Sequence, residues 1–461
     1  MIGYQNNQFI RNKKEEICMK TKNISVNNIY TLDGQVPLLK AIPFGLQHIL
    51  AMFVANLTPI TIIAAASGLS QAEIAILLQN AMFVAGIATL IQLYPIWKIG
   101  SKLPIVMGVS FTFVTVLSTV AANYGYSAVI GAVICGGIFE GIIGLFAKYW
   151  RKIIAPIVAA SVVTAIGYSL FTVGARSFGG GYTEDFGSAQ NLLLGTITLV
   201  VCLGWNIFAK GYLKQLSVLA GLIVGYITAI CMGKVDLSVI FSEGIISLPK
   251  LIPYAPEFNI GAIFSVAIIF MVSAAETIGD TTAMVSGGLN REIKSEEISG
   301  SLACDGFASA ISALFGCPPV TSFSQNVGLI SMTKVVNRFT IATGAGCMIL
   351  AGLFPPVGNF FASLPESVLG GCTVMMFGTI MVSGIEMLSK AGFTQRNITI
   401  AALSLSIGIG FTAASEIDLW HIFPDVVQSV FSANVVAVVF VVSIILNLTL
   451  PKNLEIKKIS E

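Results

Sequence analysis

Long apolar stretches alternate with short polar connections along most of this chain of 461 residues. A helix crosses a bilayer with about 20 consecutive apolar residues, and this criterion predicts fourteen membrane-spanning segments. The segments are 42–66, 71–93, 103–119, 127–147, 153–174, 190–208, 215–233, 258–286, 299–316, 321–334, 336–353, 365–386, 396–413 and 429–450. The pattern therefore predicts an all-α polytopic membrane protein, in which the third and tenth segments are unusually short.

Lysine and arginine residues are concentrated in every second connection. If the N-terminus is cytoplasmic, 22 of the 25 Lys and Arg residues lie in the tails and inner loops, and only Arg176, Lys234 and Lys250 lie outside. Cytoplasmic loops carry such an excess, and one missed span would have removed it. We therefore predict a protein of the plasma (inner) membrane with both termini cytoplasmic. We expect a disordered polar tail over residues 1–40 and a short tail over 451–461.

The two halves of the chain repeat the same order of segments. The first and eighth, third and tenth, and seventh and fourteenth segments start about 215 residues apart. Because each half has an odd number of spans, the second half must be inserted upside down relative to the first. The sequence thus predicts two inverted seven-span repeats, an architecture typical of secondary transporters.

The two short segments share a pattern that interrupts a helix. Pro318 and Pro319 open one, Pro104 opens the other, and β-branched, aromatic and hydroxyl residues of poor helix propensity follow. Irregular backbone at membrane depth is tolerated only inside protein or beside a cavity. We expect two short antiparallel strands in spans 3 and 10. Each should lead into a half-helix whose N-terminus points at a substrate.

Composition excludes several classes of function. Hydrophobic residues make up 55% of the chain and charged residues 10%, and a net charge of +2 gives no reason to expect a nucleic-acid partner. The eight cysteines are scattered and fit small packing residues. Motifs of hydrolases, zinc proteases and ATPases are absent from the sequence. We expect neither an enzyme nor a bound metal or cofactor.

Acidic residues inside predicted spans are candidates for function, because a charge within a bilayer costs a few kcal/mol or more. They are Glu140, Glu276, Asp280, Asp305, Glu366 and Glu386. Glu276 and Asp280 are four residues apart and share one helix face. Such a carboxylate pair is suited to exchange protons, as a proton-coupled carrier requires; the alternative is a pair held by backbone or hydroxyl groups.

The remaining acids have less specific interpretations. Asp305 precedes the second broken segment and either bonds its backbone or joins a proton path. For Glu140, Glu366 and Glu386 we favour a structural role.

Three further residues combine a polar or aromatic side chain with an unusual position. His48, which follows Gln47 in the first span, serves either as a helix–helix hydrogen-bonding group or in proton handling. Phe111 is either a core residue or a stacking surface for a planar ligand.

Several separated motifs resemble one known family. Gln325-Asn326-Val-Gly-Leu-Ile-Ser-Met-Thr-Lys334, the Gln47-His48 pair, the run Gly100-Ser-Lys-Leu-Pro-Ile-Val-Met-Gly108 and Glu276-Thr-Ile-Gly-Asp280 resemble motifs of the nucleobase–ascorbate transporters (nucleobase:cation symporter-2). The resemblance covers residues 37–450. It implies a core domain of spans 1–4 and 8–11 (residues 41–150 and 256–355), and a gate domain of spans 5–7 and 12–14 (residues 151–255 and 356–450). It also implies a homodimer that couples nucleobase uptake to protons, with sodium the less favoured ion.

The resemblance also implies roles for individual residues. Glu276 would bond ring N–H groups of a base, Gln325 would pair with its polar edge, and Phe111 and Ser324 would contact it from the two strands. A supporting role for the site or for proton coupling falls to Asp280, Asp305, Asn326, His48 and Gln47.

Within the family, Gln325 and Asp280 resemble the xanthine and uric acid branch, because uracil permeases carry Glu and His at these positions. A neutral amide does not repel an anionic purine as a second carboxylate would. A uracil or pyrimidine permease remains the alternative. Glu276 argues against an anion carrier of the same fold. Lys334, where purine permeases often have glycine, departs from the pattern.

Overall fold

The computed structural model describes residues 24–150, 154–241, 244–413, 419–432 and 434–451. In this part of the chain, eight helices are long and apolar enough to cross a membrane. A ninth is counted if two helices bent by 79°, Arg338–Ala351 and Pro355–Ala362, form one span. Three shorter apolar helices cover Phe111–Tyr124, Ser217–Cys231 and Val435–Thr449. The multi-span helical architecture agrees with the sequence, and the count of fourteen spans stays a prediction.

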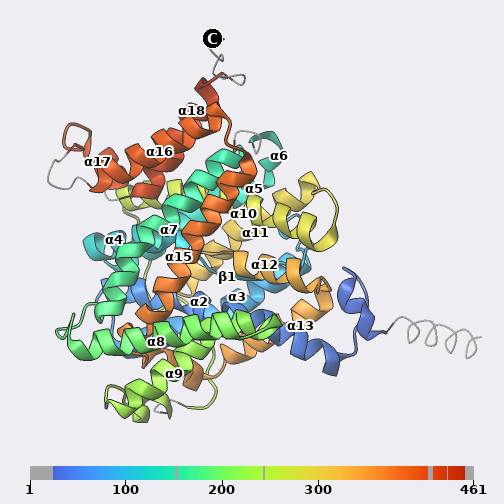
Figure 1. Cartoon of the computed structure of the whole chain (residues 1–461), viewed down its shortest axis with the longest axis vertical. Helices are drawn as coiled ribbons and strands as arrows, with labels where there is room; N and C mark the ends of the chain where they lie inside the picture. Colours follow the sequence, from blue (N-terminus) through green and yellow to red (C-terminus); the bar gives the residue numbers. More distant parts are fainter. Residues whose placement is uncertain (1–23, 151–153, 242–243, 414–418, 433, 452–461) are drawn as a thin grey trace, which may run out of the picture.

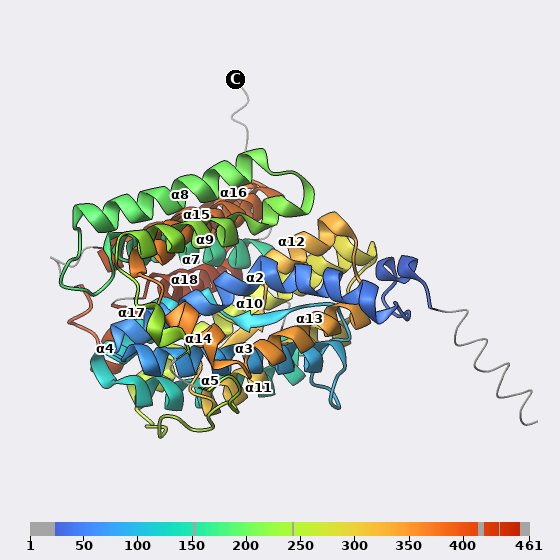
Figure 2. The same cartoon turned by 90° about the horizontal axis from the view of Figure 1, so that it is seen from below.

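The helices gather into two groups that lie on opposite sides of the molecule in Figure 2, with α7, α8, α9, α15 and α16 in its upper half and α3, α5, α11 and α13 in its lower half. The first-half helices are α2 (Leu38–Ala66), α3 (Gln71–Leu93), α4 (Val114–Tyr124), α5 (Tyr126–Leu145), α6 (Ala147–Trp150), α7 (Pro156–Gly179), α8 (Ala189–Phe208) and α9 (Ser217–Cys231). The second-half helices are α10 (Ile260–Leu289), α11 (Ser295–Leu314), α12 (Ser324–Thr333), α13 (Arg338–Ala351), α14 (Pro355–Ala362), α15 (Glu366–Ala391), α16 (Gln395–Ala413), α17 (Asp425–Phe431) and α18 (Val435–Thr449). Short 3-10 turns are η1 (Val26–Tyr30), η2 (Phe111–Phe113), η4 (Gly211–Leu216) and η5 (Leu237–Phe241).

Helices α7 and α15 run side by side through the centre of Figure 1 and pack closely. Glycines permit this approach: a Cβ added to Gly167 would lie 2.4 Å from the backbone nitrogen of Met381, and one added to Gly384 would lie 2.4 Å from that of Thr164. Within a lipid bilayer the hydrophobic effect does not drive helices together. Small residues at a helix interface let the two backbones approach closely, and the helices then gain van der Waals contact.

The segment before α2 is ordered, which corrects the expectation of a disordered tail for residues 24–37. Val336 and Asn337 donate their backbone N–H groups to the carbonyl oxygen of Ile29. Arg338 Nε donates to Asp33 Oδ1 at 2.8 Å, and Ile29 is buried. The expectation was wrong because polar composition does not reveal hydrogen bonds to a connection 300 residues away; residues 1–23 lie outside the described part.

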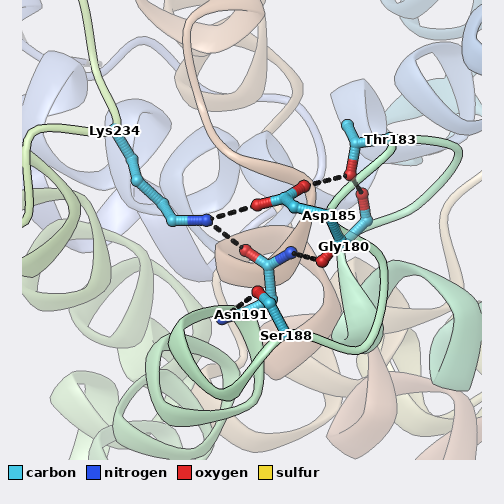
Figure 3. Close-up of polar contacts among 6 residues, drawn as sticks. All are labelled: Gly180, Thr183, Asp185, Ser188, Asn191 and Lys234. Atoms are coloured by element: carbon cyan, nitrogen blue, oxygen red, sulfur yellow. Dashed lines mark hydrogen bonds and ion pairs between the residues drawn. The ribbon is translucent and has the colours of Figure 1, made fainter.

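The connection between α7 and α8 forms a polar network with the end of α9 (Figure 3). Lys234 Nζ lies 2.7 Å from Asp185 Oδ2 and 2.6 Å from Asn191 Oδ1. Thr183 Oγ1 donates to Asp185 Oδ1 at 2.6 Å. The hydrogen bond from Lys234, followed by that from Thr183, lowers the pKa of Asp185 to about 2. We call Thr183, Asp185, Asn191 and Lys234 the outer network.

Candidate functional site

Two short strands meet near the centre of the molecule, where β1 is visible in Figure 1. β1 (Met107–Val109) pairs antiparallel with β2 (Val320–Ser322), so that Met107 lies opposite Ser322. Both strands lie within the two segments whose prolines and β-branched residues interrupt a helix.

A two-stranded ladder leaves backbone groups on both edges without a strand partner, and here neighbouring helices supply side-chain acceptors. The acceptors of the edge N–H groups are Asn56 Oδ1 for Val109 (2.7 Å), Thr89 Oγ1 for Met107 (3.0 Å) and Ser309 Oγ for Val320 (3.1 Å). Non-helical backbone is thereby satisfied inside protein, as membrane depth requires.

A cavity of about 400 Å³ lies where the two strands lead into their helices. Four of the predicted site residues line it: Phe111, Glu276, Ser324 and Gln325. Its other walls come from α2, α7, α15, the end of α8, η4 and the start of α9. The volume falls within the range of about 300–1,000 Å³ found for small-molecule sites.

Glu276 is the acid on the cavity wall. It lies on α10, and Thr112 Oγ1 donates to its Oε2 at 2.6 Å. Thr112 belongs to η2, directly after β1, so this hydrogen bond joins α10 to the first broken segment.

Asp280 lies one turn further along α10 and faces the second broken segment. Ser322 Oγ and Ser324 Oγ both donate to its Oδ2 at 2.9 Å. It does not line the cavity. Its geometry fits the alternative of a carboxylate held by hydroxyl groups, and it positions Ser324 at the cavity.

Asp305 stands behind the cavity on α11 and is fully buried. Its Oδ2 accepts a hydrogen bond from Thr277, the residue after Glu276. Its Oδ1 has no hydrogen-bond partner among the described residues. Asp305 is therefore linked to the cavity through α10.

Three further predicted residues do not line the cavity: Gln47, His48 and Asn326. Both ring nitrogens of His48 and both polar atoms of the Asn326 amide are buried without a partner in the described part of the chain. Both interpretations of His48, as a helix–helix hydrogen-bonding group or in proton handling, stay predictions.

Phe111 presents its ring to the cavity and to the opposite group of helices. Its ring centroid lies 5.3 Å from that of Phe377 on α15, at an interplanar angle of 82°. This edge-to-face contact leaves Phe111 only 7% exposed.

Sequence reasoning missed several residues around the cavity. Thr112 could have been found, because it directly follows Phe111 in the broken segment. Asn56 could have been found as a polar residue in an apolar span. Asn206, near the end of α8, could have been found in the same way. Lys214, which lines the cavity from η4, gives no signal in the sequence beyond the charge of an inner loop.

The electrostatic setting of the three acids is uniform. Within the described part of the chain, none of Glu276, Asp280 and Asp305 takes part in an ion pair. No group of three or more His, Cys, Asp or Glu residues is placed there to hold a metal ion. The site therefore offers neutral donors, buried acids and an aromatic face.

Comparison with known proteins adds to this geometry. Residues 39–417 match the permease family Xan_ur_permease. The chain is 34% identical over 442 residues to xanthine permease XanQ of Escherichia coli strain K12, covering 92% of this chain and 94% of the relative. It is 34% identical over 390 residues to uric acid permease PucJ of Bacillus subtilis strain 168, covering 82% and 86%. The transmembrane domain of the cyanobacterium bicarbonate transporter BicA matches with a TM-score of 0.53 and 15% identity, over 89% of this chain and 97% of that chain. That last likeness concerns the fold alone.

Proposed function

Since the chain belongs to the Xan_ur_permease family, the nucleobase–ascorbate transporters, we propose that it imports xanthine, uric acid or both by proton symport. The family resemblance inferred from the sequence is thereby confirmed, and with it a multi-span membrane transporter. The purine specificity rests on the permeases of xanthine and uric acid to which the chain is similar.

The observation that carries the proposal is the placement of Glu276. Its carboxylate lies on the cavity wall, held by Thr112 from one broken segment, while Gln325 lines the cavity from the other. A purine lying flat against Phe111 would donate ring N–H groups to Glu276. Its carbonyl edge would face the Gln325 amide, which both donates and accepts.

Transport then requires the two groups of helices to move relative to each other. In our proposal, fourteen spans form two inverted repeats. The core domain (41–150 and 256–355) carries the strands and acids, and the gate domain (151–255 and 356–450) closes the cavity from alternate sides. The position of Lys214 favours an inward-open state. Lys214 lines the cavity, and the charge pattern assigns its connection to the cytoplasm.

Proton coupling, orientation and assembly complete the proposal. Protons neutralise acids that have no cation partner, both termini are cytoplasmic in the plasma membrane, and two copies form a homodimer. Cysteine labelling at either terminus of intact cells, and the mass of the protein in nanodiscs, test the last two points.

The substrate is tested by uptake of labelled xanthine in cells that lack their own purine permeases. We expect uric acid to compete and uracil to fail, and a protonophore to collapse accumulation. Competition by uracil alone would assign the chain to the pyrimidine branch. Uptake that survives the protonophore and requires sodium would reassign the coupling ion.

A further inference from the structure

Glu140 on α5 is a buried acid that the proposed transport cycle does not yet use. Its side chain is 0% exposed, and neither carboxylate oxygen has a hydrogen-bond partner among the described residues. The structural role favoured from the sequence stays a prediction. An isolated buried carboxylate costs several kcal/mol, so Glu140 holds a proton in this state.

Glu140 lies at the interface through which α5 packs against α11. The backbones are very close there: a Cβ added to Gly306 would lie 2.0 Å from Gly141 N, and one added to Gly144 would lie 2.6 Å from Ala303 N. Glu140 directly precedes Gly141 and lies one turn before Gly144.

Asp305 occupies the matching position on the partner helix, directly before Gly306. Glu140 and Asp305 thus each lie next to the close approach of the two helices at Gly141 and Gly306.

Asp305 also accepts a hydrogen bond from Thr277 on α10, the residue directly after Glu276. A series of acids therefore leads from the cavity wall through α10 and α11 to α5.

The helices packed against α5 are α4, α10 and α11, and α4 contributes no acid or cation. The charged residues on the other two are Glu276, Asp280, Glu296, Glu297 and Asp305.

We infer that Glu140 is a proton-carrying residue, which takes the transported proton from the site by way of Asp305. The step that leads to the present state breaks one O–H bond at Asp305 and forms one at Glu140, directly or through one water molecule, and Glu140 must release this proton before it can accept the next one. The net charge of the pair is unchanged by this step. The inference rests on the proposed proton symport and adds a group that the site itself does not contain.

The test compares two kinds of transport in proteoliposomes. Accumulation of labelled xanthine driven by an imposed proton gradient requires Glu140 to release its proton. Exchange of external for internal xanthine at equal pH does not. We expect Glu140→Gln, which keeps the shape of the side chain, to lower accumulation about 10-fold or more and to leave exchange within about 2-fold. Glu140→Asp, which restores a titratable group, should recover part of the accumulation.

Glu386→Gln is the matched control, because Glu386 is an exposed acid paired with Lys390 at 2.7 Å. Wild-type accumulation by the Glu140→Gln variant would overturn the inference. An equal loss of accumulation and exchange would also overturn it, since a merely structural residue acts on both. If the wild type exchanges xanthine but does not accumulate it in a proton gradient, proton symport itself fails, and the role of Glu140 with it.

Discussion

Carboxylates occur in two contrasting regions of this molecule. In the outer network, Lys234 lies 2.7 Å from Asp185, whose side chain is 50% exposed. The inner acid cluster consists of Glu140, Glu276, Asp280 and Asp305. In the described part of the chain no cation pairs with these acids: hydroxyl groups donate to Glu276, Asp280 and Asp305, and Glu140 has no hydrogen-bond partner.

The difference lies in what neutralises the charge. A lysine ammonium stabilises the ionised form of Asp185 at every physiological pH, so that group is fixed in one state. Hydroxyl groups solvate a carboxylate without cancelling its charge. In the proposed proton symport, protons neutralise the inner acid cluster. The same residue type would then serve coupling in one region and hold loops together in the other.

The largest expected effect follows from neutralising the acid on the cavity wall. Glu276→Gln removes an ionisable group and a charged hydrogen-bond acceptor together, and should lower proton-driven accumulation of xanthine about 100-fold or more. Uptake is measured in parallel with the amount of protein in the membrane, with Glu386→Gln as control. Robust proton-driven uptake by the Glu276 variant would show that transport does not depend on the Glu276 carboxylate.

Adding an acid to the inner acid cluster should change selectivity. Gln325→Glu places a second carboxylate in the cavity with Glu276, and should disfavour anionic purines relative to neutral bases by about 10-fold. Inhibition constants of uric acid and hypoxanthine against labelled xanthine measure this ratio. Gln395→Glu, at the exposed start of α16, makes the same change away from the cavity. Unchanged relative affinities would exclude a direct contact of Gln325 with the base.

Removing a neutral donor should have a smaller effect. Thr112→Val keeps the side-chain shape and deletes the hydrogen bond to Glu276, and a loss of about 1 kcal/mol corresponds to about a 5-fold rise in KM for xanthine. Thr379→Val is the matched control, because Thr379 lines the same cavity but donates to Met375 O of its own helix. A similar rise in KM for both variants would contradict a specific role of the Thr112 hydroxyl.

The smallest effect is expected in the outer network. A double-mutant cycle of Lys234→Ala and Asp185→Ala should give a coupling energy of about 0.2–1 kcal/mol in thermal unfolding, as for other exposed pairs, with normal uptake.

The pH dependence follows from the lowered pKa of Asp185. The contribution of Asp185 to the free energy of unfolding is fully present above the ordinary pKa of 3.8 and is lost as the pH falls through about 2. Uptake profiles between about pH 5 and 8 should be the same with and without Lys234. A shifted profile would place this ion pair in the proton pathway.

Lys334 shows how a departure from a family pattern is explained by backbone geometry. It ends α12 with φ of 59°, a left-handed conformation that glycine adopts without steric cost. This accounts for the glycine often found there in purine permeases. In this chain, Lys334 Nζ donates to the carbonyl oxygen of Gly287 near the end of α10, which ties the site helix to the helix that carries Glu276.

The sequence by itself determined the apolar helices, the two points at which they break and the common face of Glu276 and Asp280. These features depend on hydropathy, on proline and β-branched residues and on a four-residue spacing, which are all local properties. Only the tertiary structure decided that Glu276 faces the cavity while Asp280 turns to Ser322 and Ser324. It also decided that Lys214 reaches the cavity and that α5 carries Glu140 to its interface with the helix of Asp305. Such contacts join residues about 40 to 165 positions apart, and they depend on which helix faces meet, which no local pattern encodes.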